Sequence, residues 1–460
     1  MGAGKSTLGP VLAERLGRSF VSTDEVVEER AGSSIAELFA TRGESAFREL
    51  EERAALDVLA QRALVIELGG GGLASAATRA ALEESAFTLH LDTTPEEAWE
   101  RVALSRRPLA QDPDDFRALF EARRALYEVA NASARDLDGA VLAAAGVEVS
   151  EGALGRIGEL VPGADTVELV ADEHVETLYG QRVRDALGAR IAGFHVVPAG
   201  ERAKTAAEVE RLWSALRAGR SGTIVALGGG STLDIGGFVA ATYLRGVPWV
   251  STPTTLLSQV DGGIGGKTAI DLPEGKNLIG AFHWPARTIV DPKVLETLPA
   301  AEIENGRAEV VKTGLLAGEP LWELETSEQV RRCAAFKAAI CLRDPHDRGE
   351  RAQLNLGHTF AHALEAASGY SMAHGHAVAL GLLAALRISG LDDDARRVEE
   401  ILRPTLAKVD RDAAWAALAR DKKVNDGRPT LVLLEAPGKP QLGVEVEPQV
   451  VRSALDSLIA

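Results

Sequence analysis

Residues 223–238 read TIVALGGGSTLDIGGF and decide the fold. An apolar run ends in three glycines, and a helical pattern follows. This order predicts a buried strand, a tight turn and a helix that begins at the turn. A dinucleotide pyrophosphate can approach such a backbone closely and lie at the positive end of the helix. The run does not match G-x-G-x-x-G, so a tight turn without a ligand stays open as the alternative.

Further short apolar segments lie on both sides of this unit. Strands are predicted at residues 167–170, 194–197, 223–227 and 249–251. After residue 291 the pattern becomes mostly helical, except for a hairpin over residues 429–444. Strands that alternate with helices are typical of a parallel sheet covered on both faces.

A separate α/β series precedes residue 140. It predicts helices over residues 8–16, 44–61 and 95–106, and strands over residues 63–68 and 88–91. Small apolar residues and then glycines fill residues 140–152, which is typical of a junction. The sequence therefore predicts three domains, at residues 1–140, 147–290 and 291–460.

Charge and composition restrict the possible partners. The 460 residues carry a formal net charge of −17, which argues against nucleic acid, because phosphate backbones need a basic face. The sequence contains no run of about 18 apolar residues, so we expect no membrane span, and we recognise no leader segment. Two cysteines, Cys333 and Cys341, are too few for a disulfide framework. We expect a cytoplasmic enzyme.

Residues 251–282, STPTTLLSQVDGGIGGKTAIDLPEGKNLIGAF, combine many glycines with charged and amide side chains. Glycine loses the most entropy on ordering, so a loop rather than continuous helix or strand is predicted. Asp261, Lys267, Lys276 and Asn277 suit a small, multiply charged anion. An ordinary solvated loop is the alternative.

Four of the nine histidines lie between residues 358 and 376. His358 and His362 have the spacing of H-E-x-x-H, but no glutamate follows His358, so the protease motif does not apply. Spacing alone does not establish a metal site here.

From residue 147 to the C-terminus the chain resembles 3-dehydroquinate synthases. The resemblance rests on the glycine segments above and on GRAEVVKTG, NLGHTFAH and MAHGH. It implies Glu309, His358 and His374 as ligands of Zn²⁺ or Co²⁺. It also implies bound NAD, contacted by Asp172, Glu201, Lys204, Gly229, Gly230, Asp234, Thr254, Thr255, Leu257 and Thr297.

The same resemblance implies a substrate site. The reaction would convert 3-deoxy-arabino-heptulosonate 7-phosphate, a phosphorylated sugar acid, to 3-dehydroquinate plus phosphate. Asp261, His362 and a metal-bound water are the candidates for moving protons, and Arg245 would reach across a homodimer interface. Substrate contacts would come from Lys267, Lys276, Asn277, Lys312, Lys337, Arg351, Asn355, His362 and Lys423, with Lys422 as the alternative register.

Residues 1–7, MGAGKST, form the back half of a phosphate-binding loop. In such loops the backbone and the lysine bind phosphates, and the following hydroxyl meets Mg²⁺. A further glycine and a preceding strand are not in this sequence, so a weakened core is expected. By itself the fragment is also compatible with a chance cluster.

Its neighbours make residues 1–135 resemble shikimate kinase: Phe47-Arg48, Gly69-Gly70-Gly71, Arg107-Pro108-Leu109 and Arg123 before Tyr127. The resemblance implies ATP and Mg²⁺ at Gly2, Gly4, Lys5, Ser6, Thr7 and Arg107. It implies shikimate at Asp24, Arg48, Gly70, Gly71 and Arg123. The family's Asp-x-Asp reads Ser22-Thr23-Asp24, so the first carboxylate, associated with the magnesium shell, is replaced.

These patterns and resemblances together predict an α/β fold class. We expect an incomplete P-loop kinase-like parallel domain, then a Rossmann-like domain, then a mostly helical metal-binding domain. Another sugar-phosphate cyclase and a metal-dependent polyol dehydrogenase remain alternatives for the second part, although the lysines argue against the dehydrogenase, which needs no phosphate clamp. A non-catalytic kinase fold used for dimerisation or regulation remains the alternative for the first.

Overall fold

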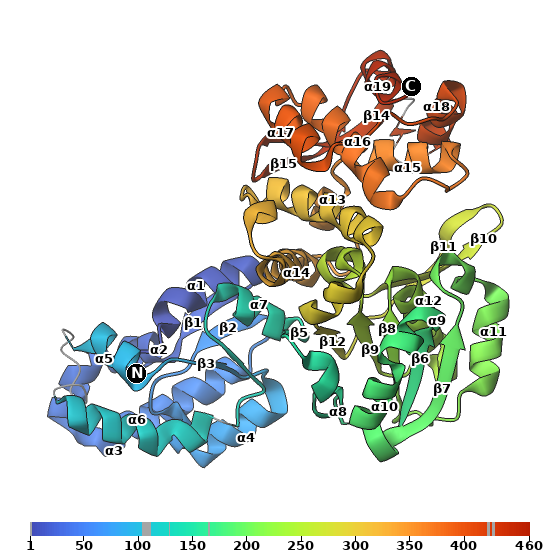
Figure 1. Ribbon diagram of the computed structural model, residues 1–460. Helices are drawn as coiled ribbons and strands as arrows, with labels where there is room; N and C mark the ends of the chain where they lie inside the picture. Colours follow the sequence, from blue (N-terminus) through green and yellow to red (C-terminus); the bar gives the residue numbers. More distant parts are fainter. Residues whose placement is uncertain (1, 104–111, 128, 164–165, 421–423, 426–427) are drawn as a thin grey trace. The chain divides into compact units, whose positions relative to one another are not determined.

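The computed structural model describes residues 2–103, 112–127, 129–163, 166–420, 424–425 and 428–460 (Figure 1). The chain divides into two compact units, Met1–Ala145 and Gly146–Ala460. Within the described residues, none of the helices combines the length and the apolar character needed to cross a bilayer.

Two short parallel strand pairs form the sheets of the first unit. Strand β1 (Ser19–Ser22) pairs with β2 (Leu64–Glu67), and β3 (Leu89–Leu91) pairs with β4 (Ala132–Ala134). No described strand joins the two pairs. The helices of this unit are α1 (Lys5–Leu16), α2 (Thr23–Ala31), α3 (Ile35–Leu59), α4 (Ala76–Ser85), α5 (Pro95–Val102), α6 (Pro113–Tyr127) and α7 (Leu137–Ala144).

The second unit is built on a six-stranded parallel sheet of order β5-β12-β9-β8-β6-β7. Four of its strands confirm the prediction. Strand β12 was not predicted, and β5 lies within the segment interpreted as a junction. The strands are β5 (Val147–Val149), β6 (Val167–Asp172), β7 (Ile191–Val197), β8 (Thr223–Gly228), β9 (Trp249–Pro253) and β12 (Arg287–Val290).

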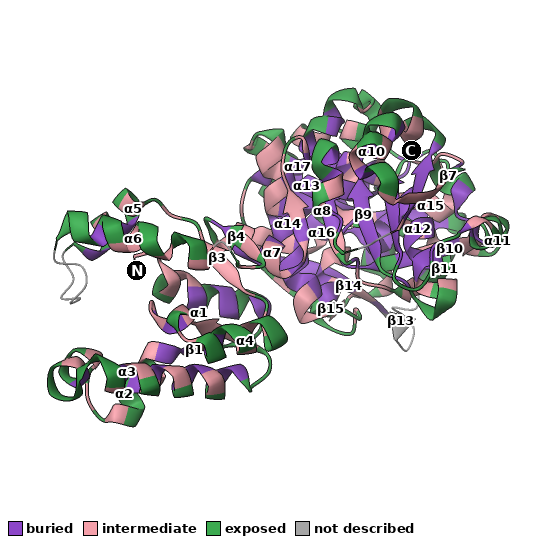
Figure 2. Ribbon diagram, turned by 90° about the horizontal axis from the view of Figure 1, so that it is seen from below, coloured by how far each residue is buried: buried purple, intermediate pink, exposed green. Residues whose placement is uncertain are grey.

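Alternating residues of β8 bury both faces of this sheet. Ile224 and Ala226 pack into the cluster that includes residues of α11 (Ala206–Ala215) and α12 (Gly230–Thr242). Val225 and Leu227 pack on the other face, with residues of α8 (Ile157–Leu160) and α10 (Gln181–Leu187). Side chains of a strand point alternately to opposite faces, so an apolar run such as TIVAL suits a central strand. Figure 2 shows buried residues concentrated in the strands of this sheet, such as β9, and in α12.

Two glycines let α12 lie close to the sheet. A Cβ atom at Gly236 would lie 2.6 Å from the Cβ of Ala226. At Gly237 it would lie 2.4 Å from Cγ2 of Thr268 and 3.0 Å from the indole of Trp249. The N-terminus of α12 is therefore held at the carboxyl end of β8, where ligands of open α/β sheets bind.

The helical half confirms the prediction for the residues after 291. Helices α13, α15 and α16 share an apolar core that includes Val311, Phe360, Leu380 and Leu383. The predicted hairpin is β14 (Arg428–Ala436) with β15 (Lys439–Glu445), preceded by β13 (Val424–Asn425). The helices are α13 (Ala300–Ala317), α14 (Thr326–Arg343), α15 (His358–Ala367), α16 (His374–Ile388), α17 (Asp392–Leu402), α18 (Arg411–Arg420) and α19 (Pro448–Asp456).

The glycine-rich segment is more regular than the sequence suggests. After β9 it forms a short helical turn, Ser258–Gly262, and then an antiparallel hairpin of β10 (Lys267–Leu272) and β11 (Gly275–Phe282). The prediction of a loop was wrong for these two strands. Gly280 stands opposite Ala269, and a Cβ there would lie 2.4 Å from the carbonyl of Thr268. In this strand glycine permits close pairing rather than preventing it.

Candidate active site

Three helices bring the predicted metal ligands together. Glu309 lies in α13, His358 begins α15 and His374 begins α16. Their ligand atoms all lie within 4.8 Å of one another. Oε1 of Glu309 is 3.4 Å from Nε2 of His358 and 3.3 Å from Nε2 of His374. Ligands on a tetrahedral Zn²⁺ with bonds of about 2.1 Å are themselves about 3.4 Å apart, so this arrangement fits such a cation.

The other ring nitrogen of each histidine has an acceptor of its own. Nδ1 of His358 lies 3.2 Å from the carbonyl oxygen of Leu356, and Nδ1 of His374 lies 3.1 Å from Oε1 of Glu365. These acceptors keep the Nδ1 proton in place and turn both Nε2 atoms toward Glu309. Such outer hydrogen bonds are the usual way in which metal-binding imidazoles are oriented.

Burial and charge act differently on the three ligands. Burial lowers the pKa of His374, but hydrogen bonds with Glu309 and Glu365 outweigh it and raise that pKa to about 9. Burial and the ammonium group of Lys312 lower the pKa of His358. Burial opposes ionisation of Glu309, yet Lys312 and both histidines hold its pKa well below the usual value. The carboxylate is fully buried, and its Oε2 has no hydrogen bond of acceptable geometry despite the ion pair with Lys312.

A buried chain of charges leads from this carboxylate to the glycine-rich segment. Lys312, which is 1% exposed, also contacts Oδ2 of Asp261 over 3.0 Å. Lys337 of α14 contacts the other oxygen of Asp261 and donates to its carbonyl over 2.8 Å. The structure thus joins three predicted substrate-site residues to the metal ligands.

A second cluster of charged residues surrounds Lys204. Its ammonium group is 2% exposed and lies 2.8 Å from Asp234, 3.6 Å from Glu201 and 3.7 Å from Asp271. It also donates to the side chain of Asn277. The predicted NAD contacts are therefore tied to the tip of the β10–β11 hairpin. Burial raises the pKa of Asp234 to about 6, even though Lys204 opposes the shift.

The carboxyl ends of β8 and β9 carry the predicted phosphate-binding backbone. The amide of Thr254 donates to the carbonyl of Gly228 over 3.0 Å, which joins the two strand ends. A Cβ at Gly229 would lie 3.2 Å from Thr255, whereas one at Gly230 would meet nothing within 4 Å. The space beside Gly230 is thus open at the N-terminus of α12, where a pyrophosphate is favoured.

Other predicted NAD contacts already have partners in the protein. Oδ1 of Asp172 accepts from the amides of His174 and Val175, and its Oδ2 accepts from Thr232 over 3.2 Å. The hydroxyl of Thr297 lies 2.6 Å from that of Tyr179. Leu257 directly precedes the turn Ser258–Gly262.

The remaining predicted substrate residues vary in exposure. Lys276 is paired with Glu201 over 3.5 Å and lies 5.0 Å from the ring centre of Tyr370. Arg351 is buried and donates to the carbonyl of Pro345, and Asn355 is half-buried. The exposed Lys267 pairs with Asp347, and the exposed ring of His362 has its centre 5.4 Å from that of His358. Lys423 and its alternative Lys422 lie outside the described residues.

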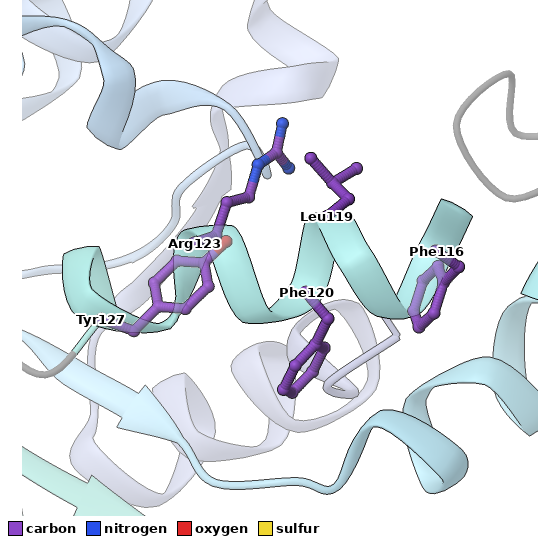
Figure 3. A pocket seen from close by; sticks show the side chains of 5 residues that line it. All are labelled: Phe116, Leu119, Phe120, Arg123 and Tyr127. Atoms are coloured by element: carbon purple, nitrogen blue, oxygen red, sulfur yellow. The ribbon is translucent and has the colours of Figure 1, made fainter. Parts of the chain in front are cut away.

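In the first unit the predicted shikimate residues gather around the glycines after β2. A Cβ at Gly71 would collide with the guanidinium of Arg48, and one at Gly69 would lie 2.4 Å from Oδ1 of Asp24. Arg123 of α6 donates to the carbonyl of Gly70 over 2.9 Å. It lines a small hollow with Leu119 and with aromatic residues of α6, namely Phe116, Phe120 and Tyr127 (Figure 3).

The predicted ATP residues surround the start of α1. Gly4 precedes this helix with φ of 88°. Gly2 has φ of 72°, and a Cβ there would lie 2.2 Å from the carbonyl oxygen of Ala98. Glycine is therefore favoured at positions 2 and 4. Lys5 opens the helix, Thr7 lies in its first turn, and Ser6 donates to Glu67 over 2.7 Å. Arg107 lies outside the described residues.

Several residues of these sites were not predicted from the sequence. Glu365 of α15 contacts His374, which begins the next helix, and no spacing rule in the sequence indicates this pair. Glu51 pairs with Arg48 three residues earlier, and burial raises its pKa. Asp271 pairs with Lys204, and Asp347 pairs with Lys267. Both pairs join residues far apart in the sequence, so no local pattern predicts them.

Comparison with known proteins agrees with this arrangement. The sequence matches the family models of shikimate kinase over residues 1–145, of the 3-dehydroquinate synthase N-terminal domain over 194–305 and of its C-terminal domain over 306–424. The 3-dehydroquinate synthase of Symbiobacterium thermophilum is 40% identical over 351 residues, which cover 68% of this chain and 97% of the relative. That of Gloeobacter violaceus is 42% identical over 67% of this chain and 95% of the relative.

Two solved structures have a similar fold over the second unit. The 2-epi-5-epi-valiolone synthase of Streptomyces hygroscopicus, solved with NAD⁺ and Zn²⁺ bound, matches with a TM-score of 0.60 and 27% identity, over 68% of this chain and 96% of that one. A 2-deoxy-scyllo-inosose synthase matches with a TM-score of 0.62 and 24% identity, over 68% of this chain and 96% of that one, and shows the shared fold.

The fold and the gathered ligands define a sugar-phosphate cyclase type of α/β protein. The chain belongs to the 3-dehydroquinate synthase family and carries a shikimate kinase domain before the synthase domains.

Proposed function

We propose that the second unit is a 3-dehydroquinate synthase that converts 3-deoxy-arabino-heptulosonate 7-phosphate to 3-dehydroquinate and phosphate. The convergence of Glu309, His358 and His374 from three helices is the observation that carries the proposal. We propose 1–140, 147–290 and 291–460 as the limits of the functional domains.

The chain's own residues hold and orient the reactants. When bound, a divalent cation would polarise hydroxyl oxygens of the substrate, and NAD would accept a hydride and later return it. Lys312 keeps Glu309 ionised as a ligand, and Glu365 keeps His374 in the correct orientation. The predicted NAD contacts lie around Gly230 and Lys204. The predicted substrate contacts include the cationic residues Lys267, Lys276, Lys337 and Arg351, and cationic donors favour the departure of a negatively charged phosphate.

Proton movements are assigned to Asp261 and His362. The carboxylate of Asp261 contacts the ammonium groups of both Lys312 and Lys337. His362 is exposed beside His358, and neutral imidazole exchanges protons near pH 7.

The test is phosphate release from the heptulosonate phosphate by the metal-loaded full chain, with NAD far below the substrate concentration. We expect many turnovers per NAD and no accumulation of NADH. Net NADH formation would instead indicate a polyol dehydrogenase. Accepting only a different sugar phosphate would indicate another cyclase of the same fold.

A matched pair of variants ties this activity to the cation site. Glu309→Gln should abolish phosphate release and lower the bound metal, because the ligand loses its charge. His376→Ala should change neither, because His376 contacts the carbonyl of Thr405 instead.

For the first unit we propose ATP- and Mg²⁺-dependent phosphorylation of shikimate. The support is the grouping of Asp24, Arg48 and Arg123 around residues 69–71. Coupled detection of ADP with shikimate present tests it. ADP formation that does not depend on shikimate, or no ADP at all, would favour the non-catalytic alternative.

We also propose a homodimer formed through the synthase part, in the cytoplasm. Arg245 is exposed in a turn in which Leu244 and Arg245 both have positive φ angles, of 51° and 68°. Such backbone persists where its surroundings require it. Light scattering of Arg245→Ala should show a lower mass than the wild type, and an unchanged dimer would remove Arg245 from the interface.

A further inference from the structure

The first unit places a carboxylate beside the hydroxyl of the phosphate-binding loop. Oγ of Ser6 donates a hydrogen bond to Oε1 of Glu67 over 2.7 Å. Ser6 lies in the first turn of α1, directly after Lys5, and Glu67 is the last residue of β2. Two oxygen atoms from separate elements therefore meet where the loop would hold phosphate.

The strand pairing explains why a glutamate can act at this place. In the parallel register of β1 with β2, Ser22 stands opposite Glu67. Thr23 fixes the two strand ends, because its hydroxyl donates to the carbonyl of Glu67 over 3.2 Å and accepts from the amide of Gly69 over 2.8 Å. The sequence has serine at position 22, where a carboxylate was expected, and a glutamate at the paired position of the next strand.

These two oxygens suit a magnesium ion bound to a nucleotide. P-loop proteins hold Mg²⁺ between the hydroxyl of the loop and a carboxylate on a nearby strand. Neighbouring oxygens around octahedral Mg²⁺ are about 2.9 Å apart, since each bond is about 2.1 Å long. The 2.7 Å between the Ser6 and Glu67 oxygens is close to that spacing.

We propose that Glu67 supplies the carboxylate for nucleotide-bound Mg²⁺ in place of position 22. This rests on the proposed nucleotide binding by the first unit. The competing role is a hydrogen bond that only orients Ser6. Glutamine would accept that hydrogen bond equally well but carries no charge, so Glu67→Gln separates the two roles.

The test measures metal binding rather than turnover. ATP binding by the full chain is titrated calorimetrically in EDTA, and Mn²⁺ binding to the protein–ATP complex is followed by electron paramagnetic resonance. In EDTA, Glu67→Gln should bind ATP as well as the wild type or better, because a negative charge near the phosphates is removed. Its complex should bind Mn²⁺ more weakly, on the order of 10- to 100-fold.

The controls use the same fold. Glu25→Gln removes an exposed carboxylate of α2 and should leave Mn²⁺ binding unchanged. Thermal melting of Glu67→Gln should match the wild type. In the double variant Ser22→Asp with Glu67→Gln, the carboxylate returns on the paired strand, and recovered Mn²⁺ affinity would support the assignment.

Two failures have different meanings. If Glu67→Gln binds ATP and also binds Mn²⁺ as tightly as the wild type, the assignment of Glu67 is overturned while nucleotide binding stands. If the wild-type chain binds no ATP with or without metal, the proposed function of the first unit is overturned together with it.

Discussion

Glu365 contacts the predicted cation only through His374, whose Nδ1 lies 3.1 Å from its carboxylate. Removing the negative charge of Glu365 should leave the imidazole of His374 in place. The ring should then be oriented less firmly, and its Nε2 should be a weaker ligand for the cation. We predict that Glu365→Gln binds Zn²⁺ about 10- to 100-fold more weakly, as measured by competition with a chelator. Glu304→Gln, an exposed carboxylate of α13, should match the wild type. Equal affinity of all three proteins would exclude a positioning role for Glu365.

The raised pKa of Asp234 should make the free energy of unfolding depend on pH. Its pKa is raised from 3.8 to about 6 in the folded protein, so ionisation of this group costs stability above pH 6. That cost disappears as the pH falls from 6 toward 4, because the folded state then binds the proton more tightly than the unfolded state. The neutral Asp234→Asn should lack this gain.

The measurement is the free energy of unfolding of both proteins between pH 7 and pH 4. Their difference should shift in favour of the wild type at low pH, by on the order of 2 kcal/mol. Parallel curves would mean that Asp234 is not perturbed by burial.

At the level of elements, the two ends of α12 separate stability from binding. A methyl group at Gly236 would collide with Ala226, whereas one at Gly230 would meet open space. Gly236→Ala should therefore lower the free energy of unfolding by about 1–3 kcal/mol. Gly230→Ala should stay within about 0.5 kcal/mol of the wild type and weaken NAD binding several-fold, since the methyl group fills the space proposed for the pyrophosphate.

Urea unfolding and NAD titration of both variants check this prediction. If Gly230→Ala binds NAD normally, the pyrophosphate does not lie at the N-terminus of α12. If it also unfolds as early as Gly236→Ala, the space beside Gly230 is not open.

The elements differ in how far the sequence could reveal them. Strands β6, β8 and β9 are predictable because they are apolar runs that end in turns, as expected for a sheet covered on both faces. Strand β5 has three residues and becomes a strand only by pairing with β12 across more than a hundred residues. The β10–β11 hairpin was missed because propensity counts against glycine, while close cross-strand contact at Gly280 requires it.

The residues of the candidate site also differ in how far the sequence could reveal them. Glu309, His358 and His374 were predicted through the resemblance to 3-dehydroquinate synthases, because the spacing of these residues alone does not establish a metal site. Three helices bring them together in the structure. The cluster around Lys204 was not foreseen as a unit, because its carboxylates come from separate elements and only folding brings them together. Glu67 was missed because its significance depends on the register between two strands.

For the whole molecule, the two sites lie in separate compact units and share no residue. We therefore predict that the two activities can be removed one at a time in the full chain. Lys5→Met should abolish shikimate phosphorylation and leave phosphate release by the synthase unchanged, and Glu309→Gln should do the reverse. Assays of both activities on both variants decide this. Loss of both activities in either variant would show that the units depend on each other.

We propose that Glu309, His358 and His374 together hold one divalent cation in the synthase part of the chain. Anomalous diffraction at the zinc edge, from crystals of the full chain grown with Zn²⁺ and NAD, tests this most directly. We expect one strong peak about 2.0–2.2 Å from a carboxylate oxygen of Glu309 and from Nε2 of both histidines. A fully occupied zinc elsewhere in the second unit, with these three side chains uncoordinated, would contradict it.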